Sequence, residues 1–269
     1  MVDGGWLSPA VSRRYAHGDL SALEQALQEA DHSPCLIVTD GVFSMDGDVA
    51  PLSGLIRLAH QHGAGLMVDD ALGMGCLGLH GQGVIANHSN DHLISQHDIP
   101  VLIGTFGKAF GTAGAFVAGD RALIDYLEQF ARTYTFTTAL PPALAQAIRT
   151  SLALMTEEPW RRERLTMLIS QFRSAMLSLK LPLLPSATPV QALILGESAR
   201  AVAASEFLLS RGIYVSAIRP PTVPAGSARL RLTLSAAHTD EQIERLVDAM
   251  AELAHTFLHS DKENCYVTG

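Results

Sequence analysis

The sequence has few cysteines and no long apolar run. Among its 269 residues the three cysteines, Cys35, Cys76 and Cys265, are far apart and odd in number. This excludes a disulfide-stapled small domain and a CxxC metal pair, so we expect reduced thiols and no metal ion. No stretch approaches the roughly 18 uninterrupted apolar residues that a membrane helix requires. The sequence therefore predicts no membrane-spanning helix.

Basic residues are also scarce. Lysine and arginine number 19 against 27 acidic residues, which gives a formal net charge of −8. Nucleic-acid binding requires a basic face, so a small-molecule partner is favoured over DNA or RNA. The first twenty residues lack the apolar segment and the cleavage pattern of a secretion signal. We expect a cytoplasmic protein with neither a nucleic-acid nor a membrane partner.

Apolar residues, which make up 48% of the chain, alternate between helical and strand patterns. Leu20, Leu23 and Leu27 recur at helical spacing after Asp19, a predicted N-cap, and a second helix is predicted over 51–63 with Gly63 as its stop. The predicted strands are short and mostly continuous apolar runs: 34–40, 65–70, 101–106 and 114–119. Such runs are typical of an α/β sheet covered by helices on both faces.

The composition changes over 180–190, where three prolines occur in "KLPLLPSATPV". We place a domain boundary there, with a large domain over 1–180 and a small α+β domain over 181–269. The second domain reads as strand, helix, strand, loop, strand and helix, and an antiparallel sheet is its expected arrangement.

Polar side chains follow three of the predicted strands, in "TDGVFSMDGD" (39–48), "DDALGMG" (69–75) and "GTFGKAFG" (104–111). In open α/β sheets, polar groups at the carboxyl ends of the strands converge on the ligand crevice. We therefore expect a ligand site at this edge of the large domain.

Lys108 is the most informative residue of the three segments. It follows an apolar strand and lies among small residues, so we expect its amine to be confined and partly desolvated. Burial lowers the pKa of a lysine and frees the neutral amine to attack a carbonyl group. The alternative, favoured by residue type alone, is a surface lysine in a turn.

Asp69 and Asp70 follow the next buried strand. One interpretation is that either aspartate caps the following turn or pairs with a structural arginine. The other is a functional carboxylate, which requires a cationic partner such as a protonated pyridine nitrogen.

Three threonines and two arginines are further candidates. Thr105, Thr137 and Thr138 could be phosphate ligands or ordinary turn residues. Arg229 and Arg231 lie two apart in a predicted strand and so project from the same face. Either could bind a carboxylate through a bidentate fork, or both could pair with acids at the domain seam.

Five ordered motifs resemble the α-oxoamine synthases, which are pyridoxal-phosphate enzymes of the aminotransferase-like fold type I. The motifs are "TDGVFSMDGDVAPL", "LMVDDALGMGCLG", "TFGKAFG" with "GAFVAG", "FTTALPPA", and "RPPTVPAG" with "ARLRLTLSAAH". The resemblance runs from about residue 7 to 258. It implies a three-layer αβα large domain, N-terminally truncated, and a small C-terminal α+β domain.

The resemblance implies pyridoxal 5'-phosphate as the cofactor. Lys108 matches the lysine that bonds to the cofactor and later moves the substrate's α-proton. Asp69 matches the acid paired with the pyridine nitrogen, and Asp70 is its less directly involved neighbour. Ser44 matches a serine beside the ring, and Thr105 matches a phosphate ligand.

The remaining implied roles concern the partner protomer and the substrate. Thr137 and Thr138 match hydroxyls offered to the phosphate across a dimer interface, so a homodimer is expected. Arg231 is the first choice for the substrate carboxylate, with Arg229 as the fallback.

The last motif favours the biotin-synthesis branch of the family. The implied reaction condenses L-alanine with a pimeloyl thioester of CoA or of a carrier protein and releases carbon dioxide, giving 8-amino-7-oxononanoate. The alternatives are another α-oxoamine synthase acting on glycine or serine, and a truncated non-catalytic homologue that serves as a partner subunit.

The sequence departs from the family pattern in two ways. Leu72 occupies the position of a histidine that hydrogen-bonds the phenolic oxygen of the cofactor, and a leucine has no donor; it is nevertheless a predicted cofactor contact. The resemblance also leads us to expect that the family's N-terminal segment, with its glycine-rich loop and ring-stacking aromatic residue, lies upstream of Met1.

Overall fold

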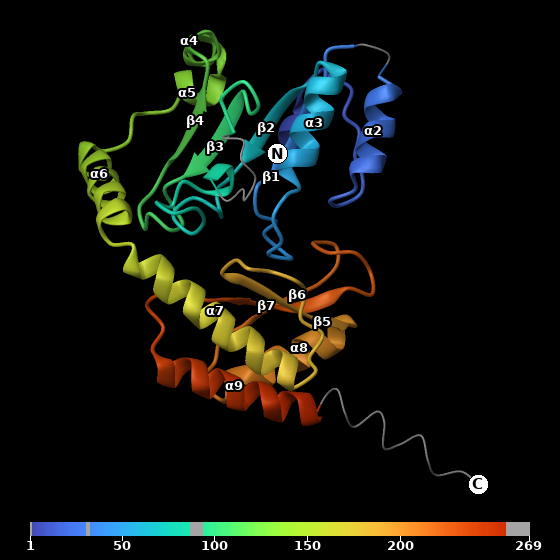
Figure 1. The fold of residues 1–269 in the computed structure, drawn as a ribbon, viewed down its shortest axis with the longest axis vertical. Coiled ribbons are helices and arrows are strands. Elements are labelled where there is room, and N and C mark those ends of the chain that lie inside the picture. Colours follow the sequence, from blue (N-terminus) through green and yellow to red (C-terminus); the bar gives the residue numbers. More distant parts are fainter. Residues whose placement is uncertain (1, 31–32, 87–93, 257–269) are drawn as a thin grey trace. The chain divides into compact units, whose positions relative to one another are not determined.

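The computed structural model describes residues 2–30, 33–86 and 94–256 (Figure 1). The chain divides into two compact units. Unit 1 contains the described residues of 1–42 and 49–157, and unit 2 contains those of 43–48 and 158–269.

Unit 1 is built on a four-stranded sheet in the order β1-β2-β3-β4. The first three strands are parallel and the fourth is antiparallel to its neighbour. Their bounds are Leu36–Asp40, Gly65–Asp69, Val101–Thr105 and Ala115–Gly119. All four predicted strands are therefore confirmed, with ends that differ by one or two residues.

The helices of unit 1 begin and end largely where the sequence predicts. Asp19 caps α2 by accepting hydrogen bonds from the N–H groups of Ser21 and Ala22, and Gly63 ends α3 in the left-handed conformation at φ 63°. The short helix α1, rich in glycine, was not predicted. The elements are α1 Val2–Leu7, α2 Leu20–Gln28, α3 Leu52–His62, the 3₁₀ helix η1 Val84–Ala86, α4 Arg121–Phe130, α5 Arg132–Thr135 and α6 Pro142–Glu157.

The core of unit 1 lies at one end of the sheet. The helices α2 and α3 bury Leu23, Leu52, Leu55 and Leu58, and β2 buries Leu66. By contrast, α4 and α6 contain no buried residue, and every residue of β4 is exposed or partly exposed. At β4, the described helices α4 and α6 leave all their side chains at least partly exposed.

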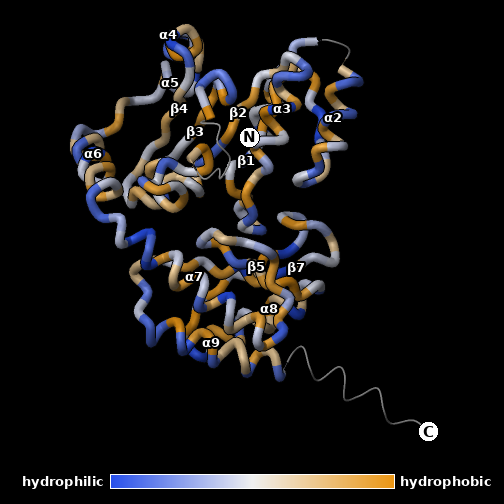
Figure 2. The backbone as a smooth tube through the Cα atoms, in the orientation of Figure 1, coloured by the Kyte–Doolittle hydropathy of each residue, from blue (hydrophilic) through white to orange (hydrophobic). Residues whose placement is uncertain are grey.

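Unit 2 contains a three-stranded sheet in the order β5-β7-β6, and its strands are antiparallel, as predicted. Helices α7, α8 and α9 lie together on one side of it (Figure 1). The large side chains of the core include Phe172 on α7, Leu230 on β7 and Met250 on α9. Figure 2 shows that β5 is largely apolar. The bounds are α7 Trp160–Ser178, β5 Val190–Gly196, α8 Ser198–Ser210, β6 Ser216–Ile218, β7 Ala228–Thr233 and α9 Asp240–Ala254.

The contact boundary lies at 157/158, not at the predicted 180. Pro159 separates α6 from α7, and α7 buries Leu168, Phe172 and Met176 in unit 2. The proline-rich stretch thus follows the first helix of the second unit. Residues 43–48, although flanked by unit 1, also belong to unit 2.

Two further features of the described residues concern membrane-spanning helices and cysteines. No helix in them is both long and apolar enough to cross a membrane. Neither Cys35 nor Cys76 takes part in a disulfide bond within the described residues, whereas Cys265 lies outside the described part of the chain.

Candidate functional site

The carboxyl ends of β1, β2 and β3 place three polar residues at one edge of the unit 1 sheet. Asp40, Asp69 and Thr105 are the last residues of these neighbouring strands, and Asp40 is the register partner of Asp69. Lys108 follows three residues after Thr105, in the turn that leads to β4. Because parallel strands end at a common edge, two carboxylates and one amine are brought to the same region.

These charges act on one another. The pKa of Asp40 is raised above its ordinary value first by burial and then by the charge of Asp69, while Lys108 lowers it. Two carboxylates in register repel each other, and a cation between them is favoured. The arrangement suits a positively charged ligand group.

Asp69 has one oxygen committed to the backbone. Its Oδ1 accepts a hydrogen bond from the Ala71 N–H at 3.1 Å, and its main-chain oxygen accepts one from the Gly41 N–H at 2.8 Å. One carboxylate oxygen of Asp69 therefore caps the following turn, as in the capping interpretation. Because a carboxylate offers two oxygens, this bond leaves acceptor capacity for a ligand.

Lys108 is exposed, which corrects the prediction that its amine is confined and partly desolvated. Its neighbours Gly107 and Ala109 are also exposed and are too small to enclose a four-carbon side chain. The backbone of the turn is nevertheless held in place. The Gly111 N–H donates to the Lys108 main-chain oxygen at 2.9 Å, and Ser151 Oγ on α6 donates to the Phe110 main-chain oxygen at 2.8 Å.

The candidate phosphate ligands bond to the backbone instead. Thr105 Oγ1 donates to the Gly114 main-chain oxygen at 3.0 Å and accepts from the Gly107 N–H at 3.2 Å. Thr137 Oγ1 donates to the main-chain oxygen of Thr133, and Thr138 is exposed. The hydroxyls of Thr105 and Thr137 thus form the backbone hydrogen bonds of ordinary turn residues. Their role as phosphate ligands stays a prediction.

The loop 70–84 contains a residue whose importance the sequence reasoning missed. Asp70 is fully buried, and its Oδ2 accepts a hydrogen bond from the Val84 N–H at 2.8 Å. Burial raises the pKa of Asp70 to about 7. Leu72, in the same loop, is partly buried. The available signal was the number of glycines in this loop, which has five between positions 73 and 83 inclusive.

Unit 2 carries the other predicted residues. Arg229 is buried and forms an ion pair with Asp46, and its Nε donates to the Ser227 main-chain oxygen at 3.0 Å. Arg231, two residues along β7, is partly exposed, and its Nε has no hydrogen-bond partner among the described residues. Arg229 thus forms the ion pair of the second interpretation, whereas the role of Arg231 stays a prediction.

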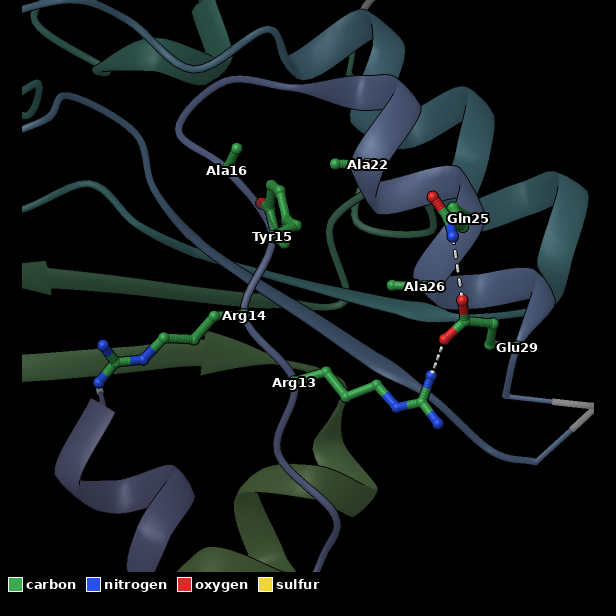
Figure 3. Close-up of a pocket in the computed structure, with 8 residues that line it drawn as sticks. All are labelled: Arg13, Arg14, Tyr15, Ala16, Ala22, Gln25, Ala26 and Glu29. Carbon is green, nitrogen blue, oxygen red and sulfur yellow. Dashed lines mark hydrogen bonds and ion pairs between the residues drawn. The ribbon is translucent and has the colours of Figure 1, made fainter.

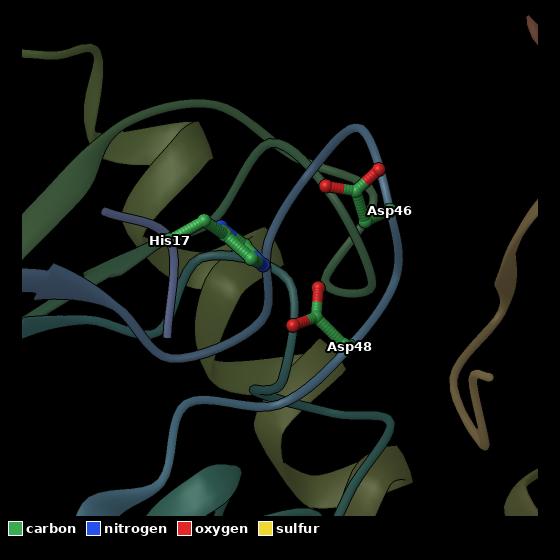
Figure 4. A group of neighbouring side chains, drawn as sticks. All are labelled: His17, Asp46 and Asp48. Atoms are coloured by element: carbon green, nitrogen blue, oxygen red, sulfur yellow. The ribbon is translucent and has the colours of Figure 1, made fainter. Parts of the chain in front are cut away.

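Asp46, which forms the ion pair with Arg229, lies on the segment 43–48. Figure 4 shows the carboxylates of Asp46 and Asp48 on this loop. Ser44 lies between Phe43 and Asp46 in the same segment and is partly buried. No motif or periodic pattern indicated that Asp46 would pair with Arg229.

A separate hollow of about 500 Å³ lies along α2 (Figure 3). Its charged groups are already engaged: Arg13 pairs with Glu29 at 2.6 Å, and the Arg14 guanidinium lies 5.3 Å from the centre of the Trp6 ring. None of the predicted site residues lines it. Its lining residues are Arg13, Arg14, Tyr15, Ala16, Ala22, Gln25, Ala26 and Glu29.

Known proteins resemble this chain in both sequence and fold. An 8-amino-7-oxononanoate synthase from Methylococcus capsulatus is 55% identical over 252 residues, which are 94% of this chain and 64% of the relative. A solved serine palmitoyltransferase from S. paucimobilis with bound PLP–myriocin aldimine has a TM-score of 0.87 at 30% identity, and the match covers 94% of this chain and 63% of that one. A solved 8-amino-7-oxononanoate synthase from Francisella tularensis has a TM-score of 0.81 at 32% identity, covering 94% and 72%.

These comparisons confirm the predicted fold class. The chain spans about 64% of the length of the curated relative from Methylococcus capsulatus. The profile of the aminotransferase class I and II family matches residues 7–250, nearly the whole chain. The chain therefore belongs to the aminotransferase class I and II family.

Proposed function

We propose that the chain is a pyridoxal-phosphate-dependent C-acyltransferase. The proposed reaction joins L-alanine to a pimeloyl thioester of CoA or of a carrier protein, and forms 8-amino-7-oxononanoate, carbon dioxide and the free thiol. The identity of 55% to a protein named for this product supports the substrate pair. Two further proposals accompany it, a cytoplasmic location and a homodimer. The exposed apolar side chains of β4 and α4, among them Val117, Tyr126 and Phe130, support the homodimer.

The observation that carries the proposal is the grouping of Asp40, Asp69 and Lys108 at one edge of the sheet. Two carboxylates in register favour a cationic group beside them, and a protonated pyridine nitrogen is such a group. Lys108 supplies an amine from the adjacent strand end. These residues fit the pyridine ring and the aldehyde carbon of pyridoxal phosphate. When bound, this cofactor acts as an electron sink for a carbanion at the substrate's α-carbon.

The protein groups have separate tasks in this proposal. Asp69 would keep the pyridine nitrogen protonated through its remaining carboxylate oxygen. Lys108 would bind the cofactor and then, as a neutral amine, take the α-proton of alanine. Leu72 would contact the ring through apolar surface only, because it has no hydrogen-bond donor.

The other proposed ligands rest on the family resemblance. Thr105, Thr137 and Thr138 are proposed for the cofactor's phosphate. Ser44 is proposed for the ring. Arg231 is proposed for the substrate carboxylate, because Arg229 is already engaged by Asp46.

The number of lysines permits a direct test. The sequence contains three: Lys108, Lys180 and Lys262. We expect borohydride reduction of the chain with pyridoxal phosphate, followed by peptide mapping, to fix the cofactor on Lys108. In Lys108→Ala the site-specific product and the visible absorbance band should both disappear. Equal labelling of all three lysines would reject the proposal.

A second candidate is an acyltransferase acting on serine or glycine, which the structural match to serine palmitoyltransferase favours. L-Alanine should perturb the visible band of the lysine-bound cofactor at lower concentration than L-serine or glycine. The reverse order would support the second candidate. A chain that binds no cofactor would instead support a non-catalytic partner subunit.

A further inference from the structure

The side chain of Asp70 is enclosed by backbone. It is the first residue after β2, it is fully buried, and its Oδ2 accepts the Val84 N–H. Burial of a carboxylate is costly unless its oxygens are well bonded, and hydrogen bonds from the backbone of Val84 and Gly73 lower the pKa of Asp70 by less than burial raises it. The position therefore keeps an acid despite its energetic cost.

Three glycines make room for this carboxylate. A Cβ atom at Gly83 would lie 1.8 Å from Asp70 Oδ2, one at Gly73 would lie 2.1 Å from Oδ1, and one at Gly41 would lie 2.9 Å from Oδ1. Real Cβ atoms do not approach an oxygen so closely. The Asp70 carboxylate thus fills the space that side chains at these three positions would need. Gly41 follows β1, and Gly73 and Gly83 lie near the two ends of the loop 70–84.

The same backbone holds Asp69 and borders the Lys108 turn. Asp69 and Asp70 are joined to the neighbouring strand ends by hydrogen bonds, from the Gly41 N–H to the Asp69 oxygen and from the Asp70 N–H to the Ile103 oxygen, both at 2.8 Å. Farther along the loop, a Cβ at Gly75 would lie 2.6 Å from the Cβ of Ala109. The loop therefore packs directly on the residue that follows Lys108.

We propose that Asp70 is a positioning residue, whose enclosed carboxylate fixes the loop 70–84 and so sets the positions of Asp69 and the Lys108 turn for the cofactor. The proposal rests on the proposed function for its cofactor step. Asp70 itself contacts neither substrate nor cofactor in it. A displacement of about 1 Å at either group would lower the efficiency of the reaction strongly.

The enclosure can be tested without any cofactor. Gly73→Ala would place a methyl group against Asp70 Oδ1, and Gly73 lies outside the left-handed region, so the change adds no backbone strain of that kind. Asp70→Ala would remove the obstructing carboxylate. We expect the urea midpoint of the double variant to exceed that of Gly73→Ala alone. Additive losses would show that the two groups do not meet and would overturn the proposal.

The positioning step is tested by the yield of borohydride-trapped pyridoxal phosphate on Lys108. Asp70→Asn keeps the shape and one acceptor for the Val84 N–H, so its yield should stay near that of the unchanged chain. Asp70→Ala should lower the yield at a subsaturating cofactor concentration by about tenfold. Leu58→Ala, a fully buried change on α3, is the control for lost stability alone.

The outcomes separate the two proposals. If Asp70→Ala retains the yield of the unchanged chain, or if Leu58→Ala loses as much at equal stability, Asp70 is structural only and the positioning proposal is wrong. If the unchanged chain shows no trapping on Lys108, the proposed function fails. The urea midpoints of Gly73→Ala, Asp70→Ala and the double variant then still decide whether the backbone encloses the Asp70 carboxylate.

Discussion

Two loops that follow neighbouring strands, 43–48 and 70–84, hold their acids in different ways. In the first, Asp46 pairs with the Arg229 guanidinium, and the Gly47 main-chain oxygen accepts the hydroxyls of Ser186 and Thr188 at 2.8 and 2.9 Å. In the second, Asp70 is held by backbone N–H groups, and the charge of Asp69 is unfavourable to its ionised form. The first loop is thus anchored by side chains far away in the sequence, and the second mainly by its own backbone.

This difference decides how each loop responds to its surroundings. An ion pair that is largely buried resists changes of pH until one partner is removed, and then leaves an unpaired charge. A buried carboxyl group without an ion-pair partner instead changes its own protonation state. Both loops also contain a glycine that is required for close approach, since a Cβ at Gly47 would lie 2.2 Å from the Val190 main-chain oxygen.

The largest expected effect is the pH dependence that Asp70 imposes on stability. Burial raises its pKa to about 7 from an ordinary 3.8, so between these values the folded chain binds a proton that the unfolded chain has released. Asp70 therefore makes the free energy of unfolding fall as pH rises from about 4 to about 7, by an amount on the order of 4 kcal/mol. Urea unfolding of the unchanged chain and of Asp70→Asn across this range measures the difference.

The comparison of the two proteins cancels the titration of all groups that they share, including the histidines. Asp98→Asn is the control of opposite sign, because hydrogen bonds from Ser95 lower the pKa of Asp98, whose contribution is then lost as pH falls. If the difference between the unchanged chain and Asp70→Asn did not vary with pH, the description of Asp70 as a buried acid would be wrong.

The second effect concerns the ion pair of the loop 43–48. Arg229→Ala removes the guanidinium that pairs with Asp46, whose side chain is only 27% exposed. We expect the free energy of unfolding to fall by about 3 kcal/mol, measured by urea unfolding at neutral pH. Arg161→Ala, which breaks an exposed pair with Glu158 at 2.5 Å, should cost less than about 1 kcal/mol. Equal losses in the two variants would remove the distinction between buried and exposed pairs.

The elements of the fold could be predicted because their signals are local. Apolar spacing located the strands of both sheets and most helices, and Asp19 and Gly63 act as the predicted helix start and stop. Strand order also placed Asp69 and Lys108 at a common edge. These predictions depend on backbone preferences and periodicity, which neighbouring residues determine.

What could not be predicted depends on contacts between distant residues. Asp46 and Arg229 are 183 positions apart in the sequence, and no periodic pattern connects them. The burial of Asp70 depends on Gly41 as well as on its own loop. The exposure of Lys108 was mispredicted because small neighbours were taken as a sign of confinement, whereas in this turn they leave the side chain uncovered.

A smaller effect is expected from one hydroxyl that anchors the loop 43–48. Thr188 is fully buried, and Thr188→Val keeps its shape while removing the hydrogen bond to the Gly47 oxygen together with the bonds to Ser186 Oγ at 3.0 Å and from the Val190 N–H at 3.3 Å. The expected loss is about 1 kcal/mol of unfolding free energy, because Ser186 still donates to the same oxygen. Thr166→Val, at an exposed position of α7, is the matched control. A loss as small as that of the control would show that Ser186 alone is sufficient.

The smallest effect is expected at Leu72, where the loop 70–84 offers apolar surface and no side-chain donor. Leu72→His would add a donor, and a net hydrogen bond of about 0.7 kcal/mol would tighten pyridoxal phosphate binding about threefold. Equilibrium dialysis with the chain and with Leu72→His measures this. Leu72→Phe separates the hydrogen bond from ring contact, since phenylalanine adds an aromatic face without a donor. Unchanged or weaker affinity in Leu72→His would mean that this side chain does not reach the cofactor, and a gain shared by Leu72→Phe would assign the effect to stacking.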